Sequence, residues 1–377
     1  MASFKRFLGF IAVIFGLLVV LAGAFVYFVD INHLKPLLIR KVQQMTGREL
    51  VVDGPLSWSF WPTPGIAAGH LALKNSAGFA TPYFFEADSV RFSPSLSPLL
   101  HGKVEGDVRC GQLSVSGVSM QDVKAHFDFS QGVLQIAPVT GKLYEGNASL
   151  STQIHLQPLQ VSGQLDVSGV QMAPLLQALD QHAALSGVGK LSLTLAASGE
   201  TGAVMLSNLN GTGQFSVANG SLQGIDLNHL IDAALALAGK QLPGSSQGST
   251  SFTALTGTLQ IRNGVATNPD LLLSAPRFTV NGTGSVDLPA STLHYALQAH
   301  LRSDSANPES DPLALYGLPV PILVTGSLAN PAVRLDSGTL LQALAKQQLK
   351  KAVGNVGGIQ NNLPPQAGKL LNRLFGQ

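Results

Sequence analysis

Charged side chains are scarce in this chain. Asp, Glu, Lys and Arg together make up 12 % of its 377 residues, whereas an average soluble domain has about 25 %. The formal net charge is only +2, and proteins that bind nucleic acid usually carry a strongly basic face. We therefore expect no nucleic acid among the partners of this protein.

Cysteine and aromatic residues are also few. Cys110 is the single cysteine, which excludes a disulfide within the chain and leaves the redox compartment open. Aromatic residues account for 6 % of the sequence, whereas glycine occurs 40 times and apolar residues reach 45 %. Such a composition is typical of many short strands joined by turns.

One long apolar run begins the chain. No charged residue occurs from 7 to 29, and a helix of that length is about 34 Å long, enough to cross a bilayer core of about 30 Å. Lys5 and Arg6 precede the run, which predicts a cytoplasmic segment 1–6 and a body on the other side. Residues 22–24 (AGA) also fit a signal-peptidase site, but the apolar run continues to Val29, so we predict an uncleaved transmembrane anchor.

The segment 30–47 follows the anchor with apolar residues at helical spacing. This pattern predicts an amphipathic helix. Two interpretations stay open, a helix that caps the folded body and a helix that lies in the membrane interface.

Residues 48–336 show a period of two rather than a helical period. Leu191, Leu193 and Leu195 alternate with Ser192 and Thr194, which predicts strands with one apolar and one polar face. Tight hairpins are predicted at Asn-Gly pairs and one Asp-Gly pair, since both residues tolerate positive φ; these lie at 210–211, 219–220, 263–264, 281–282 and 53–54. The predicted fold is mainly β, an elongated and curled antiparallel sheet that forms an open β-groove, with a few helices and one preceding transmembrane helix.

Two helical inserts interrupt the strands, at 174–185 and 226–235, and Asp226 is placed to cap the second. Asp336 is the last acidic residue of the chain. The segment that follows it, 337–377, contains five Lys and Arg residues and therefore forms a basic tail. This tail is predicted to be amphipathic, either as a solvated end of the chain or as a contact with anionic lipid.

Catalytic and metal-binding patterns were tested and give no candidate. The residues 244–248 (GSSQG) match the nucleophile pattern G-x-S-x-G around Ser246, but they lie in a Ser/Gly-rich loop instead of the strand–turn–helix that the motif requires. The nine histidines are scattered without the spacing of a zinc site. We therefore predict no enzyme activity, no catalytic residue, no cofactor and no metal.

Several segments resemble the AsmA family of bacterial envelope proteins. The N-terminal ones are TGREL at 46–50, VVDG at 51–54, WSFWP at 58–62, LKNSAGF at 73–79, SLSPLLHGKV at 95–104 and GKLYEG at 141–146. The C-terminal ones are GQFSVANGSLQGIDLNHLI at 213–231, FTALTGTLQIRNGVA at 252–266, VNGTGSVDLP at 280–289 and LPVPILVTGSLANPAVRLD at 318–336. The chain looks like a short member of this family, because members are usually longer between the two matching halves.

The resemblance implies a single-pass anchor in the bacterial inner membrane, a body in the periplasm, and a groove similar to that of bridge-like lipid transfer proteins. It also implies a role in phospholipid traffic and outer-membrane biogenesis, with phospholipids, the inner membrane and outer-membrane or envelope proteins as partners.

The residues themselves support lipid binding, since an apolar sheet face must be covered and each buried CH2 group contributes about 0.8 kcal/mol. The predicted function is the binding or conduction of phospholipid acyl chains in the groove, in support of outer-membrane lipid homeostasis. The alternatives are an envelope scaffold that assists outer-membrane protein assembly without lipid and, third, an anchored hydrolase that uses Ser246. The lipid-facing candidates are Leu191, Leu193, Leu195, Phe215, Val217, Leu259, Ile261, Phe278, Val280 and Leu297.

Overall fold

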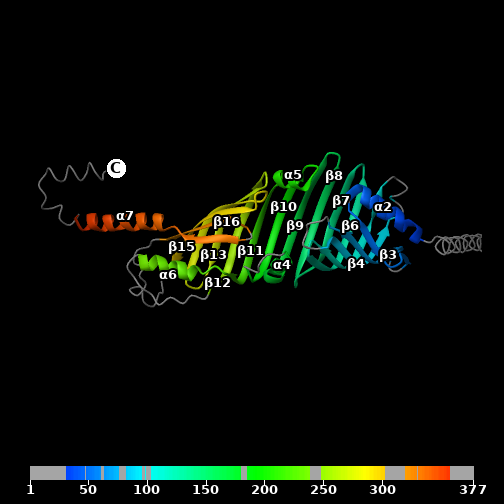
Figure 1. Cartoon of the computed structure of the whole chain (residues 1–377). Helices are drawn as coiled ribbons and strands as arrows, with labels where there is room; N and C mark the ends of the chain where they lie inside the picture. Colours follow the sequence, from blue (N-terminus) through cyan, green and yellow to red (C-terminus); the bar gives the residue numbers. More distant parts are fainter. Residues whose placement is uncertain are drawn as a thin grey trace, which may run out of the picture. The chain divides into compact units, whose positions relative to one another are not determined.

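Figure 1 shows a computed structural model of the chain. The structure describes residues 31–46, 48–60, 63–75, 82–95, 98, 103–179, 185–237, 248–301, 319–328 and 330–356. This part of the chain is mainly β, with 17 strands in one large antiparallel sheet and few helices, which confirms the mainly β, antiparallel part of the predicted fold. The predicted anchor at 7–29 lies outside the described residues. Among the helices within them, none has the length and apolar character needed to cross a membrane.

The chain divides into two compact units. Unit 1 comprises Met1–Asp180 and Ser192–Glu200, and unit 2 comprises Gln181–Leu191 and Thr201–Gln377. Strand β10 (Val188–Ser198) supplies residues to both units.

Unit 1 is an antiparallel meander. Each strand from β3 to β9 pairs with the next one, and β1 and β2 both pair with β3. Figure 1 shows β6 to β9 side by side in chain order. The elements are η1 (Ile31–Leu34), α2 (Lys35–Thr46), β1 (Leu50–Asp53), β2 (Ser57–Ser59), β3 (Gly65–Lys74), β4 (Tyr83–Pro94), β5 (Val104–Val115), β6 (Val118–Ser130), β7 (Val133–Leu143), β8 (Gly146–Leu156), β9 (Leu159–Gln171) and α4 (Met172–Ala178).

Short helical segments cover parts of the apolar face of unit 1. Ile31 of η1 packs into a buried cluster with Val52, Leu56 and Ala68. Leu175 of α4 packs against a second cluster, which contains Leu143, Ala148 and Val170. Among the described residues, these short helices pack against two small clusters of the apolar face.

Unit 2 is a second meander, in which each strand from β11 to β17 pairs with the next. Helix α6 contacts β12 and β17, and α7 contacts β16. Leu227, Ile231 and Ala234 of α6 and Leu340 of α7 are almost fully buried. The elements are α5 (Gly202–Ser207), β11 (Asn210–Gln223), α6 (Leu227–Leu237), β12 (Ser249–Arg262), β13 (Val265–Ser274), β14 (Phe278–Asp287), β15 (Thr292–Leu301), β16 (Val320–Ser327), β17 (Asn330–Leu335) and α7 (Ser337–Val356).

Most of the helices fall where helical patterns were predicted. Helix α2 lies within 30–47, α4 and α6 overlap the two predicted inserts, and α7 occupies the first part of the basic tail. The predicted cap of α6 is confirmed, since Asp226 Oδ1 accepts a hydrogen bond of 2.9 Å from the backbone N–H of His229. The short α5 was not predicted, because its six residues carry no helical period that a sequence pattern can reveal.

The hairpin prediction is correct at Asn263-Gly264, where both residues have positive φ between β12 and β13. It is wrong at the other three Asn-Gly pairs. Residues 210–211 begin β11, 219–220 lie inside β11, and 281–282 lie inside β14. Asn219 has a φ of 51°, so this pair forms a local irregularity within a long strand. The Asp-Gly pair also forms no two-residue hairpin, because β1 pairs with β3 and not with β2.

Candidate functional site: two apolar sheet faces

The two faces of the unit 1 sheet differ in chemistry. On one face, Val123, Ala125 and Phe127 of β6 lie opposite Cys110, Val108 and Gly106 of β5. On the other face the intervening residues are polar. This register confirms the period of two that the sequence predicts, because neighbouring side chains of a strand point to opposite faces.

The apolar face of unit 1 continues across β7, β8 and β9. Leu150 of β8 lies opposite Val139 on one side and Leu165 on the other, yet 37 % of its surface stays exposed. Val104 and Val115 of β5 are each 39 % exposed. A continuous apolar face that keeps its large side chains this exposed has the character of a binding surface rather than a finished core.

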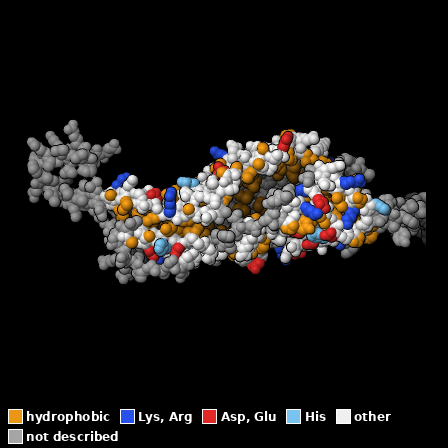
Figure 2. Space-filling model, viewed as in Figure 1, with side chains coloured by type: hydrophobic (Ala, Val, Ile, Leu, Met, Phe, Trp, Pro, Cys, Tyr) orange, Lys and Arg blue, Asp and Glu red, His pale blue; other side chains and the backbone are white. Residues whose placement is uncertain are grey.

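The surface over β9 and β10 is hollowed and lined by hydrophobic side chains (Figure 2). The polar side of β10 is identified by Ser192, whose hydroxyl donates a hydrogen bond of 2.6 Å to Asp166 of β9. Leu193 and Leu195 therefore point to the opposite side of β10, together with Leu165 and Val167 of β9.

Unit 2 carries an apolar face of the same kind. Val217, Leu255, Leu273, Val280, Ala299 and Val320 lie opposite one another in one row across six strands. A neighbouring row contains Gly282, Leu297, Ile322 and Leu335. The alternate residues of the same strands, such as Thr258, Asn281 and Gln298, lie on the other face and are exposed.

Polar groups are rare on the apolar face of unit 2. Asn268 is 1 % exposed, and its side-chain nitrogen donates to Thr258 O at 2.6 Å while its Oδ1 has no hydrogen-bond partner. Tyr295 is also on this face, and burial raises the pKa of its phenol. The phenol therefore stays protonated and uncharged at neutral pH, as an apolar environment requires.

The structure separates the ten lipid-facing candidates into two groups. Val217, Ile261, Phe278 and Val280 are between 1 % and 6 % exposed, so they lie inside packed parts of unit 2. The other six are partly exposed on the apolar sides of their strands; they are Leu191, Leu193, Leu195, Phe215, Leu259 and Leu297.

The sequence interpretation missed the contribution of β8 and β9 to this surface. Leu150, Val161 and Leu165 are partly or largely accessible on its apolar face. The signal was present, since Val161, Gly163, Leu165 and Val167 alternate with polar residues in β9. In β8 the alternation is interrupted by Thr152, which lies opposite Gly163 on the same face.

Other chemistry finds no support in the described residues. They contain no group of three or more His, Cys, Asp or Glu residues arranged to hold a metal. Ser246, the residue of the hydrolase alternative, lies outside the described residues. Cys110 is buried on the apolar face, and this burial raises the pKa of its thiol.

Comparison with known proteins gives a family match. The family model described as the AsmA family matches residues 1–108 and 103–271. The chain is also 27 % identical over 154 residues to Protein AsmA of Escherichia coli (strain K12), an alignment that covers 41 % of this chain and 22 % of that protein. No solved structure matches the chain significantly. With the family match covering more than half of its residues, this chain belongs to the AsmA family.

Proposed function

We propose that this protein binds phospholipid acyl chains on its apolar sheet faces and conducts them along those faces. In this proposal an N-terminal helix at residues 7–29 anchors it in the inner membrane, its body lies in the periplasm, and its activity supports outer-membrane lipid homeostasis and biogenesis. Membership of the AsmA family is compatible with a place in the bacterial envelope.

The observation that carries the proposal is the exposure of large side chains within the apolar face of unit 1. Leu150, Val104 and Val115 are more than a third exposed, although they lie in register within broad apolar rows. Leaving such a face in water is unfavourable. Acyl chains would cover it, because each buried CH2 group contributes about 0.8 kcal/mol without any charged contact.

Binding of this kind requires no reaction, and we infer that the protein is not an enzyme. Its specificity would come from the fit of chains to an apolar surface, with the polar headgroup left at the rim. This inference is drawn from the chemistry of the apolar faces of the two units.

The test is site-specific photo-crosslinking in cells. A photoreactive residue at Leu193 or Leu259 should capture phospholipid, whereas one at the neighbouring Thr194 or Gln260 should not, because these side chains point to the polar face. Val280 is a further control, since it is 1 % exposed and should capture nothing. Absence of captured lipid at both leucines in a folded protein would favour a scaffold that carries no lipid.

A charge on the apolar face provides a functional test. Leu193→Asp should block lipid movement, because an unpaired charge on an apolar surface resists desolvation by acyl chains. Thr194→Asp is the matched control, with the same charge one residue away on the polar face. Circular dichroism of both variants identifies simple unfolding. Equal lipid transport by both folded variants would contradict the proposal.

Topology is tested separately. Alkaline phosphatase fused to the C-terminus should be active if the body lies in the periplasm, as the Lys5-Arg6 flank predicts. An inactive phosphatase together with an active cytoplasmic reporter at the same point would place the body in the cytoplasm.

A further inference from the structure

Helix α2 has one side packed on unit 1 and one side in solvent. Ile39 packs against the buried cluster that contains Ile31 and Val52. Leu37 precedes Ile39 by two residues, which places its side chain about 200° away around the helix axis, on the opposite side. Leu37 is 58 % exposed and the adjacent Leu38 is 46 % exposed. The inner side of α2 therefore contributes to the fold, whereas its outer side carries two leucines that the fold leaves in water.

A third large apolar side chain is exposed in the same part of unit 1. Trp58 of β2 packs against the same buried cluster as Ile39. Phe60 follows Trp58 by two residues, so their Cα atoms are at most about 7 Å apart, and Phe60 is 60 % exposed. Single exposed apolar residues are ordinary on a protein surface, but several around one small cluster are typical of a contact site.

The charge of this segment suits an anionic surface. Residues 31–48 contain two lysines and two arginines and no Asp or Glu. Arg40 is exposed on the outer side of α2, about 60° around the axis from Leu37, and it forms no ion pair with another residue in the described part of the chain. Lys35 instead holds the helix to the body, since its Nζ donates to Gly54 O at 3.2 Å. Exposed leucines next to basic residues, without acids, are typical of helices that lie in a bilayer interface.

The place of α2 in the sequence brings it close to the predicted anchor. The uncharged run 7–29 ends eight residues before Leu37, and the residues from Ile31 to Leu37 are helical, first in η1 and then in α2. Helical residues rise by about 1.5–2 Å each and the two residues before Ile31 span at most about 3.6 Å each, so Leu37 lies within about 20 Å of the end of the run. If that run spans the membrane, α2 lies beside the headgroup layer.

We propose that the outer side of α2 binds the surface of an anionic bilayer, with Leu37 and Leu38 in the interface and Arg40 beside the lipid phosphates. An arginine presents a planar fork that binds phosphate oxygens in pairs. This inference rests on the membrane anchor of the proposed function and adds the place where the body touches the bilayer. Because the inner side of α2 packs on the apolar face of unit 1, the contact would hold the start of that face next to the lipids it binds.

The test measures the depth of α2 with the full chain reconstituted into vesicles. Leu37→Cys in a Cys110→Ala background is labelled with the fluorophore NBD. The vesicles contain phosphatidylglycerol and phosphatidylcholine, and part of the phosphatidylcholine carries a nitroxide on its acyl chain, which quenches NBD at short range. Quenching at residue 37 should be at least about twofold stronger than at an exposed control site on α2, because an interfacial helix buries its apolar side about 5–10 Å into the boundary between headgroups and acyl chains.

Gln43 is the matched control on the same helix. It is exposed, and its position in the sequence places it on the side of α2 opposite to the midpoint between Leu37 and Leu38. Gln43→Cys, labelled in the same background, should be quenched only weakly. The role of charge is tested with vesicles of phosphatidylcholine alone, in which quenching at residue 37 should fall. Arg40→Gln should reduce the difference between the two vesicle compositions.

Flotation of the vesicles reports on the anchor separately. Protein that does not float with the vesicles contradicts the anchor of the proposed function and, with it, the contact of α2. Protein that floats but is quenched equally at residues 37 and 43 overturns the contact alone, while the anchor and lipid capture at Leu193 are unaffected. A blue-shifted emission at residue 37 without quenching would mean that α2 packs against protein, such as a second copy of the chain, and it overturns the proposal as well.

Discussion

The ring of Tyr295 lies directly over Gly284 on the neighbouring strand. The two residues face each other across β14 and β15, and a Cβ atom on Gly284 would overlap the ring. Leu297 lies over Gly282 in the same way. In both pairs a large side chain of β15 covers a glycine of β14, which keeps the apolar face continuous where no side chain projects from the glycine itself.

Gly284→Ala should therefore destabilise the protein. The added methyl group forces the Tyr295 ring from its place, and overpacking of this kind costs about 1–3 kcal/mol. Thermal unfolding followed by circular dichroism measures the change. Gly202→Ala is the control, since nothing lies within 4 Å of a Cβ at that position. Equal melting temperatures for the two variants would mean that the ring moves aside without cost.

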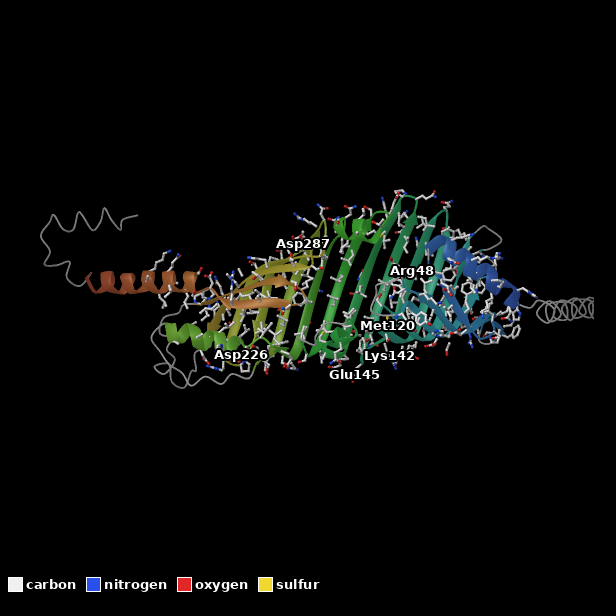
Figure 3. The ribbon with its side chains drawn as sticks, viewed as in Figure 1. Arg48, Met120, Lys142, Glu145, Asp226 and Asp287 are labelled. Atoms are coloured by element: carbon white, nitrogen blue, oxygen red, sulfur yellow. The ribbon has the colours of Figure 1, made fainter. Side chains whose placement is uncertain are left out.

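Asp226→Ala should loosen the start of helix α6. Figure 3 labels Asp226 at this helix end, and its carboxylate accepts hydrogen bonds from His229 N at 2.9 Å and Gly248 N at 3.3 Å. Loss of such a cap costs about 0.5–2 kcal/mol. Hydrogen exchange of the first turn of α6 should accelerate. Asp226→Asn retains an acceptor oxygen and should behave almost like the parent protein.

Cys110 should react slowly with thiol reagents in the folded protein. Burial raises the pKa of its thiol, and the negative charge of Asp88 adds to this effect. A raised pKa leaves less of the reactive thiolate at pH 8, so labelling should be at least about tenfold slower than for an exposed cysteine. Thr194→Cys in a Cys110→Ala background supplies that exposed reference. Similar rates before and after unfolding in urea would contradict the burial of Cys110.

Thr339→Val should change how α7 responds to acid. Thr339 donates to Asp336 from its hydroxyl at 2.7 Å and from its backbone N–H at 3.1 Å, and these bonds lower the pKa of Asp336. A lowered pKa stabilises the fold above the ordinary carboxyl pKa, and this contribution is lost as the pH falls through the lower folded value. Melting temperatures of parent and variant should differ at neutral pH and converge as the pH falls below the lowered pKa of Asp336. If the difference in melting temperature stays constant with pH, the Thr339 hydroxyl stabilises the fold equally whether Asp336 is charged or neutral.

Ser246→Ala should leave function unchanged. By its sequence, the G-x-S-x-G match around Ser246 lies in a Ser/Gly-rich segment, which is not the strand–turn–helix that positions a catalytic serine. Complementation of a deletion strain measures the effect. Complete loss of function with normal expression would revive the hydrolase interpretation, and serine-directed activity probes would then identify the nucleophile.

The lipid-facing candidates illustrate how far the sequence pattern reaches. The alternation of leucine with serine and threonine in β10 correctly assigned Ser192 to the polar face, where it bonds to Asp166. The same reasoning predicted that Phe278, Val280 and Leu297 all face lipid. In the structure Phe278 and Val280 are almost fully buried, whereas Leu297 is partly exposed. Parity along a strand identifies a face, but it does not say which part of that face neighbouring elements cover.

By itself, the sequence determined the strand period, the two chemically different faces, the capped helix α6 and the family. These features depend on residues close together in the chain, where backbone geometry relates spacing to direction. Only the tertiary structure decided which Asn-Gly pairs turn and which glycines lie under Tyr295 and Leu297. These features depend on strand register and bulges, which arise from pairing between segments that are distant in sequence.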